Sequence, residues 1–320
     1  MFYWKKLGNI FNPTTSKTKS WMEEYSQLPV PYIYSDKLIR VYFATRPKKD
    51  IKNNYVSRSG YVDLNRNNLK EVINIGSKPL FELGLPGSFD EFGSMTSCFL
   101  DVGDKIYGYY TGWSRLETVP YTMAIGLAIS SDKGETFQKI SDGPILGQTT
   151  KEPFLLSGPK IIIENGLWHM WYLVGTKWLK NKDKFEPVYK FAHATSKDGI
   201  NWNRNGRQIL ESKYENECQV SFSVFKFKDK WNAIFAYRQP TNYRGNSNGS
   251  YRLGYAWSND LQKWNRDDDK VGINVSQNGW DSEMIAYPHI MEIDEKIYLF
   301  YCGNEFGKFG FGIAELINFQ

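Results

Sequence analysis

Short runs in which polar residues alternate with β-branched and aromatic residues recur along the chain, each after a polar turn. Alternation with a period of two, bounded by turn residues, predicts half-buried β-strands. Successive central aromatic residues of these runs are 67, 62, 63 and 66 positions apart, at Phe43, Tyr110, Tyr172, Phe235 and Tyr301. The runs themselves are Leu38–Arg46, Lys105–Trp113, Leu167–Gly175, Lys230–Arg238 and Lys296–Gly303.

A second repeated element follows the middle runs. It consists of a strand, a turn with Asp and often Gly, and an aromatic residue. Asp and Gly adopt the backbone conformations that tight turns require, so the Asp side chains are expected to stabilise the turns. The copies are Ala128–Phe137, which has the spacing of an Asp-box, Ala194–Trp202 and Ala256–Trp264, and a truncated copy surrounds Ala314.

These repeats define five units of about 60 residues, each with several short strands and almost no helical periodicity. Radial repetition of small sheets is the arrangement of a β-propeller. The sequence therefore predicts an all-β, five-bladed β-propeller that forms a single domain over residues 1–320. The expected blades are 25–75, 90–146, 152–210, 215–272 and 281–320, with an N-terminal strand closing the last blade near Phe311–Leu316.

Composition narrows the possible functions. Aromatic residues make up 16% of the chain and hydrophobic residues 41%, which excludes a disordered protein. The net charge of +5 is dispersed, so no nucleic-acid partner is expected, and no apolar run is long enough for stable membrane insertion. Cys98, Cys218 and Cys302 are an odd, widely spaced set. We therefore expect a cytoplasmic protein with no disulfide framework, metal or cofactor.

Several strings resemble a known family. These are Gly87–Gly93, Ala124–Ala128, Pro144–Leu146 and Trp280–Pro288, the last containing the specific run Trp-Asp-Ser-Glu-Met. With the five repeats, they are similar to the five-bladed glycosidase-like superfamily of glycoside hydrolase families 32, 43, 62, 68 and 130. The resemblance is strongest to glycosidase-like proteins of bacterial surface-polysaccharide gene clusters, and it extends over nearly the whole chain.

The resemblance implies an active site in a funnel at one end of the propeller axis, lined by the start of the innermost strand of each blade. Glycoside hydrolysis generally uses two carboxylates that flank the scissile bond. The segments that lead into the inner strands supply Asp90, Glu217 and Glu283, on blades two, four and five. We expect these three to be the catalytic residues, with Glu283 as general acid or base, although each could instead stabilise a turn or the packing of a blade.

The chain departs from the superfamily pattern where hydrolases carry their carboxylates. Leu28 stands before the blade-one proline, Met95 or Thr96 stands at the blade-two position, and Ser157 replaces the glutamate of the Glu-Gly-Pro string. The usual set of three carboxylates is therefore not carried over. Any catalysis would need a different set of residues.

Other residues are candidates for substrate binding because they lie at strand ends or beside the expected funnel. Arginine and lysine there could hold an anionic sugar or a nucleotide-sugar, and aromatic residues could stack on sugar rings, although surface solvation and blade capping would explain them equally. The candidates are Arg46, Glu91, Trp113, Lys177, Arg238, Asp281, Tyr287 and His289.

The sequence thus predicts a protein that hydrolyses or transfers a glycosyl group in bacterial surface-glycan metabolism, with a carbohydrate or nucleotide-sugar as its ligand. One alternative is a glycoside phosphorylase or glycosyltransferase, because an attacking phosphate can replace one missing carboxylate. Another is a sugar-binding propeller without catalysis. The sequence defines neither the sugar, the linkage nor the oligomeric state.

Overall fold

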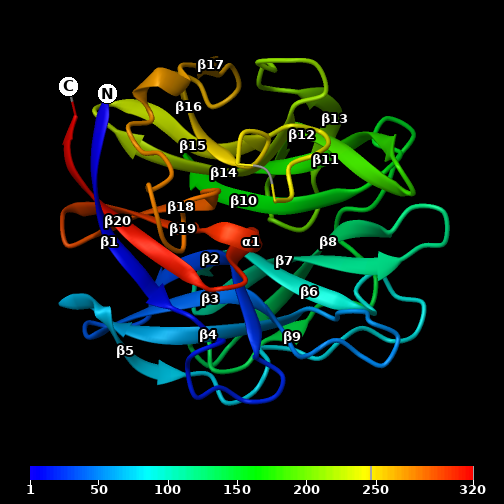
Figure 1. The fold of residues 1–320 in the computed structure, drawn as a ribbon, viewed down its shortest axis with the longest axis horizontal. Helices are drawn as coiled ribbons and strands as arrows, with labels where there is room; N and C mark the ends of the chain where they lie inside the picture. The colour runs from blue at the N-terminus through cyan, green and yellow to red at the C-terminus, as the bar shows by residue number, and fades with distance from the viewer. Residues whose placement is uncertain (246, 320) are drawn as a thin grey trace.

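The computed structural model describes residues 1–245 and 247–319. These residues form five antiparallel sheets of four strands, arranged around a central axis (Figure 1). This confirms the predicted five-bladed β-propeller. In the described part of the chain, no helix combines the length and the apolar character needed to cross a bilayer.

Each blade runs from an inner strand at the axis to an outer strand at the perimeter. Blade 1 contains β2 (Glu24–Ile33), β3 (Leu38–Arg46), β4 (Arg58–Asn65) and β5 (Asn68–Ile75). Blade 2 contains β6 (Gly93–Val102), β7 (Lys105–Arg115), β8 (Tyr121–Ser130) and β9 (Gln138–Lys139). Blade 3 contains β10 (Leu156–Glu164), β11 (Leu167–Asn181), β12 (Lys184–Ser196) and β13 (Asn203–Gln208).

Blade 4 contains β14 (Cys218–Phe227), β15 (Lys230–Arg238), β16 (Arg252–Ser258) and β17 (Asn265–Arg266), followed by the short 3₁₀ helix η1 (Asp268–Lys270). Blade 5 contains β18 (Ala286–Ile293), β19 (Lys296–Cys302) and β20 (Phe311–Phe319), with the helical turn α1 (Asn304–Gly307) between β19 and β20.

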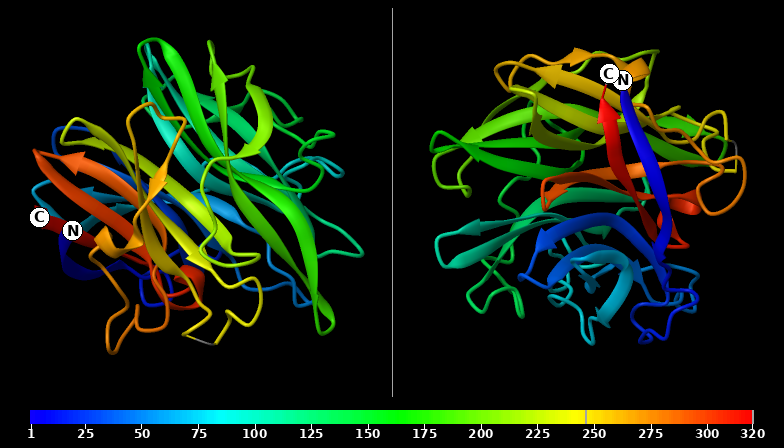
Figure 2. Two further views of the ribbon diagram at one scale, coloured as in Figure 1. Left: turned by 90° about the horizontal axis from the view of Figure 1, so that it is seen from above. Right: turned by 90° about the vertical axis from the view of Figure 1, so that its left-hand side faces the viewer.

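The fourth strand of blade 5 comes from the other end of the chain. β1 (Phe2–Phe11) pairs with β20 in antiparallel register, from Phe2 opposite Phe319 to Phe11 opposite Phe311. The two ends of the chain lie side by side in both views of Figure 2. The ring of blades is therefore closed by hydrogen bonds between the first and the last strand.

The predicted central aromatics form the core of the blades. Phe43, Tyr110, Tyr172, Phe235 and Tyr301 are all at most 1% exposed. Each lies on the second strand of its blade and packs with the apolar residues of neighbouring sheets. Burial of such large side chains is the main stabilising contribution.

The repeated Asp turns hold one end of the propeller. Asp132 accepts hydrogen bonds from the backbone N–H groups of Glu135 (3.1 Å) and Thr136 (3.0 Å). Asp198 and Asp260 accept equivalent bonds in the turns of blades 3 and 4. These aspartates therefore act as turn stabilisers at the end of the blades opposite the strand starts that lead towards the expected funnel.

Candidate functional site

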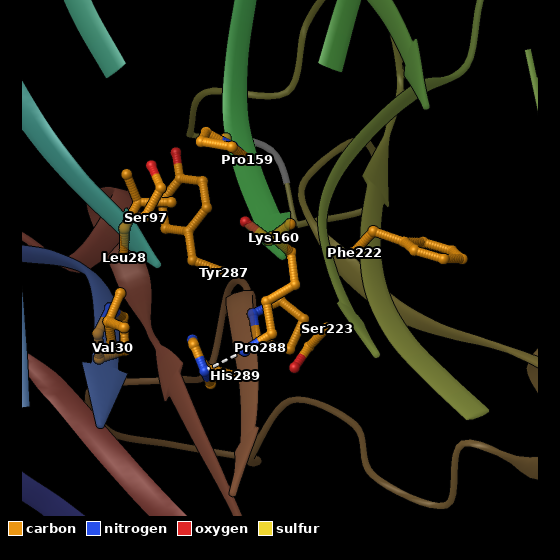
Figure 3. A pocket seen from close by; sticks show the side chains of 13 residues that line it. Leu28, Val30, Ser97, Pro159, Lys160, Phe222, Ser223, Tyr287, Pro288 and His289 are labelled. Carbon is orange, nitrogen blue, oxygen red and sulfur yellow. Dashed lines mark hydrogen bonds between the residues drawn. The ribbon is translucent and has the colours of Figure 1, made fainter. Parts of the chain in front are cut away.

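All five inner strands carry a β-bulge at the same position, and the bulged residues line the central channel (Figure 3). The bulged positions are Leu28, Ser97, Gly158, Ser221 and Tyr287. We call these five residues the funnel floor.

Backbone strain is concentrated in the funnel floor. Leu28, Ser221 and Tyr287 have φ angles of 56°, 57° and 55°, and Gly158 has a φ of 59°. The left-handed region costs a residue with a Cβ roughly 1–2 kcal/mol. Such strain persists where the surrounding structure fixes it, and it is concentrated at functional sites.

No residue that lines the described channel carries a carboxylate. Leu28, Ser97 and Gly158 stand at or next to the positions where the superfamily pattern places its acidic residues. Ser157 precedes the bulge and is buried. The funnel floor therefore does not supply the two flanking carboxylates that glycoside hydrolysis generally needs.

The carboxylates predicted from the sequence lie a few residues before the floor, and three of them belong to a repeated structural arrangement. In blade 2, Asp90 is 1% exposed, pairs with Lys139 of the outer strand at 2.5 Å and accepts a hydrogen bond from Tyr110 at 3.0 Å. In blade 5, Asp281 pairs with Lys6 in the same way at 2.6 Å. Each carboxylate thus joins the outer strand to the start of the inner strand.

The same arrangement occurs in the two blades between them. Glu217 of blade 4 is completely buried and binds Arg266 at 2.7 Å and Gln219 at 2.9 Å. Glu152 of blade 3 pairs with Arg204. We call these four groups, built on Asp90, Glu152, Glu217 and Asp281, the blade clusters. Buried, fully hydrogen-bonded ion pairs of this kind fit a structural role.

The other predicted acidic residues lie in solvent-accessible places. The carboxylate of Glu283 is exposed and has no hydrogen bond to the described residues, while its backbone is held by Asn304 and Arg252. Glu91 accepts a hydrogen bond from the backbone N–H of Gly87. Of the predicted catalytic residues, Glu283 is therefore the one whose carboxylate is open to a ligand.

Arg238 is buried beneath an aromatic group. Its guanidinium is 1% exposed, donates hydrogen bonds to the hydroxyls of Tyr251 (3.1 Å) and Tyr189 (3.0 Å), and stacks on Tyr243 with its carbon 3.6 Å from the ring centre. Burial raises the pKa values of Tyr189 and Tyr251 well above their ordinary value, so both keep their protons. Arg238 thus positions the aromatic residues around it.

Above this group lies a more accessible layer. Glu186 of β12 accepts hydrogen bonds from Tyr243 at 2.5 Å and from the exposed Arg244 at 2.6 Å. Partly exposed aromatic rings surround these polar groups, and rings beside charged and hydroxyl groups suit sugar binding. The rings are Tyr121, Trp178, Tyr287 and Phe306, from blades 2, 3 and 5.

A second group of aromatic and basic side chains lies on blades 1 and 2. Arg46 stacks on Tyr25 and Tyr55 at 4.4 and 4.9 Å, and its buried Nε atom has no hydrogen-bond partner among the described residues. Trp113 packs beside Phe92. Lys177, at the end of β11 in blade 3, is exposed to solvent. The end of the blades at which the inner strands start therefore carries all three predicted binding residues, Arg46, Trp113 and Lys177.

His289 lies inside the channel, below the funnel floor. Its Nε2 atom is 2.6 Å from the Nζ atom of Lys160, which projects from β10 (Figure 3). Lys160 is not among the residues predicted from the sequence, although it follows Gly158 and Pro159 as His289 follows Tyr287 and Pro288. That shared spacing was the available signal. Glu186, Arg244 and Tyr189 gave no comparable pattern.

Two hollows differ in size. The channel cavity measures about 30 Å³, well below the roughly 300 Å³ at which ligand pockets begin. A larger open hollow of about 770 Å³ lies at the outer edge of blades 3 and 4, between β13 and β17, where Trp264 and Arg207 are among its polar and aromatic lining.

In the part of the chain that the structure describes, no three His, Cys, Asp or Glu side chains are placed to hold a metal.

Comparison with known proteins places the chain among relatives. An uncharacterized protein of Mycobacterium tuberculosis, MT1551, is 31% identical over 316 residues, which cover 98% of this chain and 99% of that protein. A 1,2-β-oligomannan phosphorylase of Thermoanaerobacter is 25% identical over 167 residues, 52% of this chain and 48% of the phosphorylase. No protein-family model matches the chain.

Solved structures share the fold. A thermostable family-43 glycoside hydrolase has a TM-score of 0.67 at 12% identity, and the match covers 95% of this chain and 94% of the hydrolase. A structure from the GH130 family of mannoside phosphorylases, which contains glycoside hydrolases that target β-1,2-mannosidic linkages in Candida mannan, has a TM-score of 0.66 at 15% identity. That match covers 98% of this chain and 94% of the other protein.

Proposed function

We propose that this chain binds a carbohydrate in the funnel and transfers a glycosyl group to a phosphate-type acceptor. The premise is that the chain belongs to the family of its mycobacterial relatives, within the five-bladed glycosidase-like propeller superfamily. The observation that carries this proposal is the funnel floor without carboxylates. Hydrolysis by a carboxylate pair has no support there, since no carboxylate lines the floor.

A phosphate acceptor removes the need for that second carboxylate. Phosphate is already an anionic nucleophile, so one of its oxygens can bond to the anomeric carbon without a general base. The glycosidic C–O bond breaks, and one carboxylic acid gives its proton to the leaving oxygen. The products are a sugar 1-phosphate and a glycan shortened by one unit.

Glu283 suits the role of the acid, and the basic residues near the funnel suit the binding of phosphate. The exposed carboxylate of Glu283 is free of protein partners among the described residues, so a bound glycan can reach it, and it acts as the acid if the glycan that covers it keeps it protonated. Arg46 and Lys177 form no ion pair with the described residues, and Arg244 is exposed although it pairs with Glu186. Arginine and lysine are common phosphate ligands. The partial similarity to a 1,2-β-oligomannan phosphorylase supports the same chemistry.

A second candidate function is carbohydrate binding without catalysis. The contacts of Asp90 and Glu217 favour it, because both carboxylates are buried in blade clusters instead of facing a ligand. The aromatic rings around Glu186 and Arg244 would bind sugar in either case. We place both candidates in bacterial surface-glycan metabolism, with a nucleotide-sugar as an alternative ligand, as the resemblance implies.

The test measures sugar release from a panel of oligosaccharides, activated glycosides and nucleotide-sugars, with and without phosphate. We expect release that depends on phosphate and yields a sugar 1-phosphate. Glu283→Gln should abolish turnover and retain ligand binding and melting temperature. Asp281→Asn, two residues away in a blade cluster, is the matched control and should lower the melting temperature instead.

The outcomes separate the candidates. Release that is equally fast without phosphate would contradict the transfer proposal and return hydrolysis to first place. Turnover that Glu283→Gln leaves intact would contradict the role of Glu283. Sugar binding without turnover on any substrate would favour the binding protein.

A further inference from the structure

Lys160 places an amino group inside the central channel. It projects from β10, its side chain is partly buried, and its described hydrogen-bond partner is His289 Nε2 at 2.6 Å from the Nζ atom (Figure 3). His289 is 8% exposed. When Lys160 is protonated, its ammonium group can only donate, so the neutral imidazole then accepts at Nε2 and carries its own proton at Nδ1. Burial, and then the charge of Lys160, lower the pKa of His289 well below its ordinary value.

This charge has no counter-ion among the described residues. No carboxylate lies within ion-pair distance of Lys160. Cys98 is the acidic group whose negative charge would act on Lys160. Burial raises the pKa of the Cys98 thiol, so the thiol stays uncharged. An unpaired charge in a protein interior is costly, and burial lowers the pKa of Lys160 for this reason. The charge of Lys160 is therefore left to be balanced by water or by an anion in the channel.

The space beside Lys160 fits the second possibility. The cavity of about 30 Å³ can hold a small ion or one or two water molecules, but not a sugar ring. Ser97, Ser221 and Ser223 are among the residues that line it, and the Ser97 hydroxyl also donates to the Met95 carbonyl at 3.3 Å. Ser223 accepts the backbone N–H of Ile290 at 2.8 Å, so its own proton can point at another acceptor. The lining thus combines the Lys160 ammonium group with serine hydroxyls that can donate hydrogen bonds.

We propose that the channel binds one small monovalent anion of the halide class, held by Lys160 and the serine hydroxyls below the funnel floor. A single positive charge matches a single negative charge. The cavity is too small for a phosphate or a carboxylate sugar. The anion would join strands from blades 1, 2, 3, 4 and 5 at the axis, because the residues that line the cavity come from all five. This site is independent of the proposed reaction.

Crystals soaked in sodium bromide test the site directly. Data collected at the bromine absorption edge should give an anomalous peak in the channel, within hydrogen-bond distance of Lys160 Nζ. The wild-type protein suffices for this experiment. A channel that contains only water, with no anomalous peak in crystals that bind bromide elsewhere, would overturn the proposal.

Thermal unfolding gives the matching test in solution. Replacing sodium gluconate with sodium bromide at equal ionic strength should raise the melting temperature by about 2 °C or more, as binding to the folded state alone requires. Lys160→Met should lose this rise, and the exposed Lys197→Met in the same blade should keep it. An equal rise in Lys160→Met, or no rise in the wild type, would contradict a channel anion.

Discussion

The blade clusters and the funnel floor lie next to each other in the sequence and differ in almost every physical respect. Glu217 precedes Ser221 by four residues, and Asp90 precedes Ser97 by seven. The carboxylates of the clusters are buried, charged and hydrogen-bonded to the outer strands. The floor is uncharged, and three of its five residues carry a Cβ at a positive φ.

This difference separates two uses of the same segments. The carboxylates fix the start of each inner strand from outside, and the bulge that follows turns the next residue into the channel. A carboxylate near an active-site position is therefore not by itself a catalytic group. Its partners decide, and here the partners are Lys139, Arg204, Arg266 and Lys6 on the outer strands.

The largest expected effect is the loss of a cluster cation. Arg266→Met leaves Glu217 buried and uncompensated, which should lower the free energy of unfolding by about 3–5 kcal/mol. Urea unfolding measures this. The control is Arg58→Met, which removes the partner of the exposed Glu82 and should cost no more than about 1 kcal/mol. Equal effects of the two changes would show that the clusters are not structural.

A smaller effect is expected from the tyrosine of a cluster. Tyr172 donates a hydrogen bond to the buried Glu152, so Tyr172→Phe should lower the free energy of unfolding by about 1.5–3 kcal/mol. Blade 4 is the natural comparison, because Phe235 occupies the same position and Gln219 satisfies Glu217 there. An unchanged midpoint in Tyr172→Phe would mean that water replaces the hydroxyl without cost.

The strain of the floor can be tested by exchanging side chains at two equivalent positions. Gly158→Ala adds a Cβ that meets only Leu173 at 3.5 Å, so its cost of about 1 kcal/mol would come from the backbone. Ser221→Gly should stabilise the protein or leave it unchanged, since relief of strain opposes added freedom of the unfolded chain. Stabilisation by Gly158→Ala would contradict a strained floor.

The smallest effect concerns an exposed carboxylate. Burial would raise the pKa of Asp132, but hydrogen bonds from Thr136 and Ser130 outweigh it and lower the pKa to about 2. A lowered folded-state pKa stabilises the protein above the ordinary pKa of 3.8 and loses that contribution as the pH falls towards 2. Asp132→Asn should remove this pH dependence, by less than about 1 kcal/mol after solvent screening.

Thermal unfolding at a series of pH values between 4 and 2 measures the contribution of Asp132. The control is Asp142→Asn, an exposed aspartate in the loop after β9, and it should keep the wild-type slope. Identical slopes in Asp132→Asn and the wild type would contradict the turn role.

Much of the fold could be predicted from the sequence because its repeats are local. The aromatic run around Tyr110 and the Asp turn at Asp132 recur at a nearly constant spacing, and each depends on residues close in the chain. The site depends on long-range pairing. The partners Lys139 of Asp90 and Lys6 of Asp281 come from outer strands 49 and 275 residues away, which one sequence read alone does not reveal.

The predicted site residues also divide into those fixed by local sequence and those that depend on long-range pairing. Tyr287 and His289 were expected near the axis from the string that contains them, and both line the channel. Arg238 lies at a strand end, as expected, but its burial depends on Tyr189 and Tyr251 from other strands. The catalytic roles of Asp90, Glu217 and Glu283 stay predictions, and the contacts favour Glu283.

Closure of the ring through β1 and β20 also sets the order of events during synthesis. Phe2 leaves the ribosome long before its partner Phe319, because 317 positions separate them in the chain. Until then, β1 has no strand to pair with and the ring of blades stays open. The final docking joins contacts of very high sequence separation, which are slow to form. We expect nascent chains that stop before β20 to be the form that chaperones and proteases recognise.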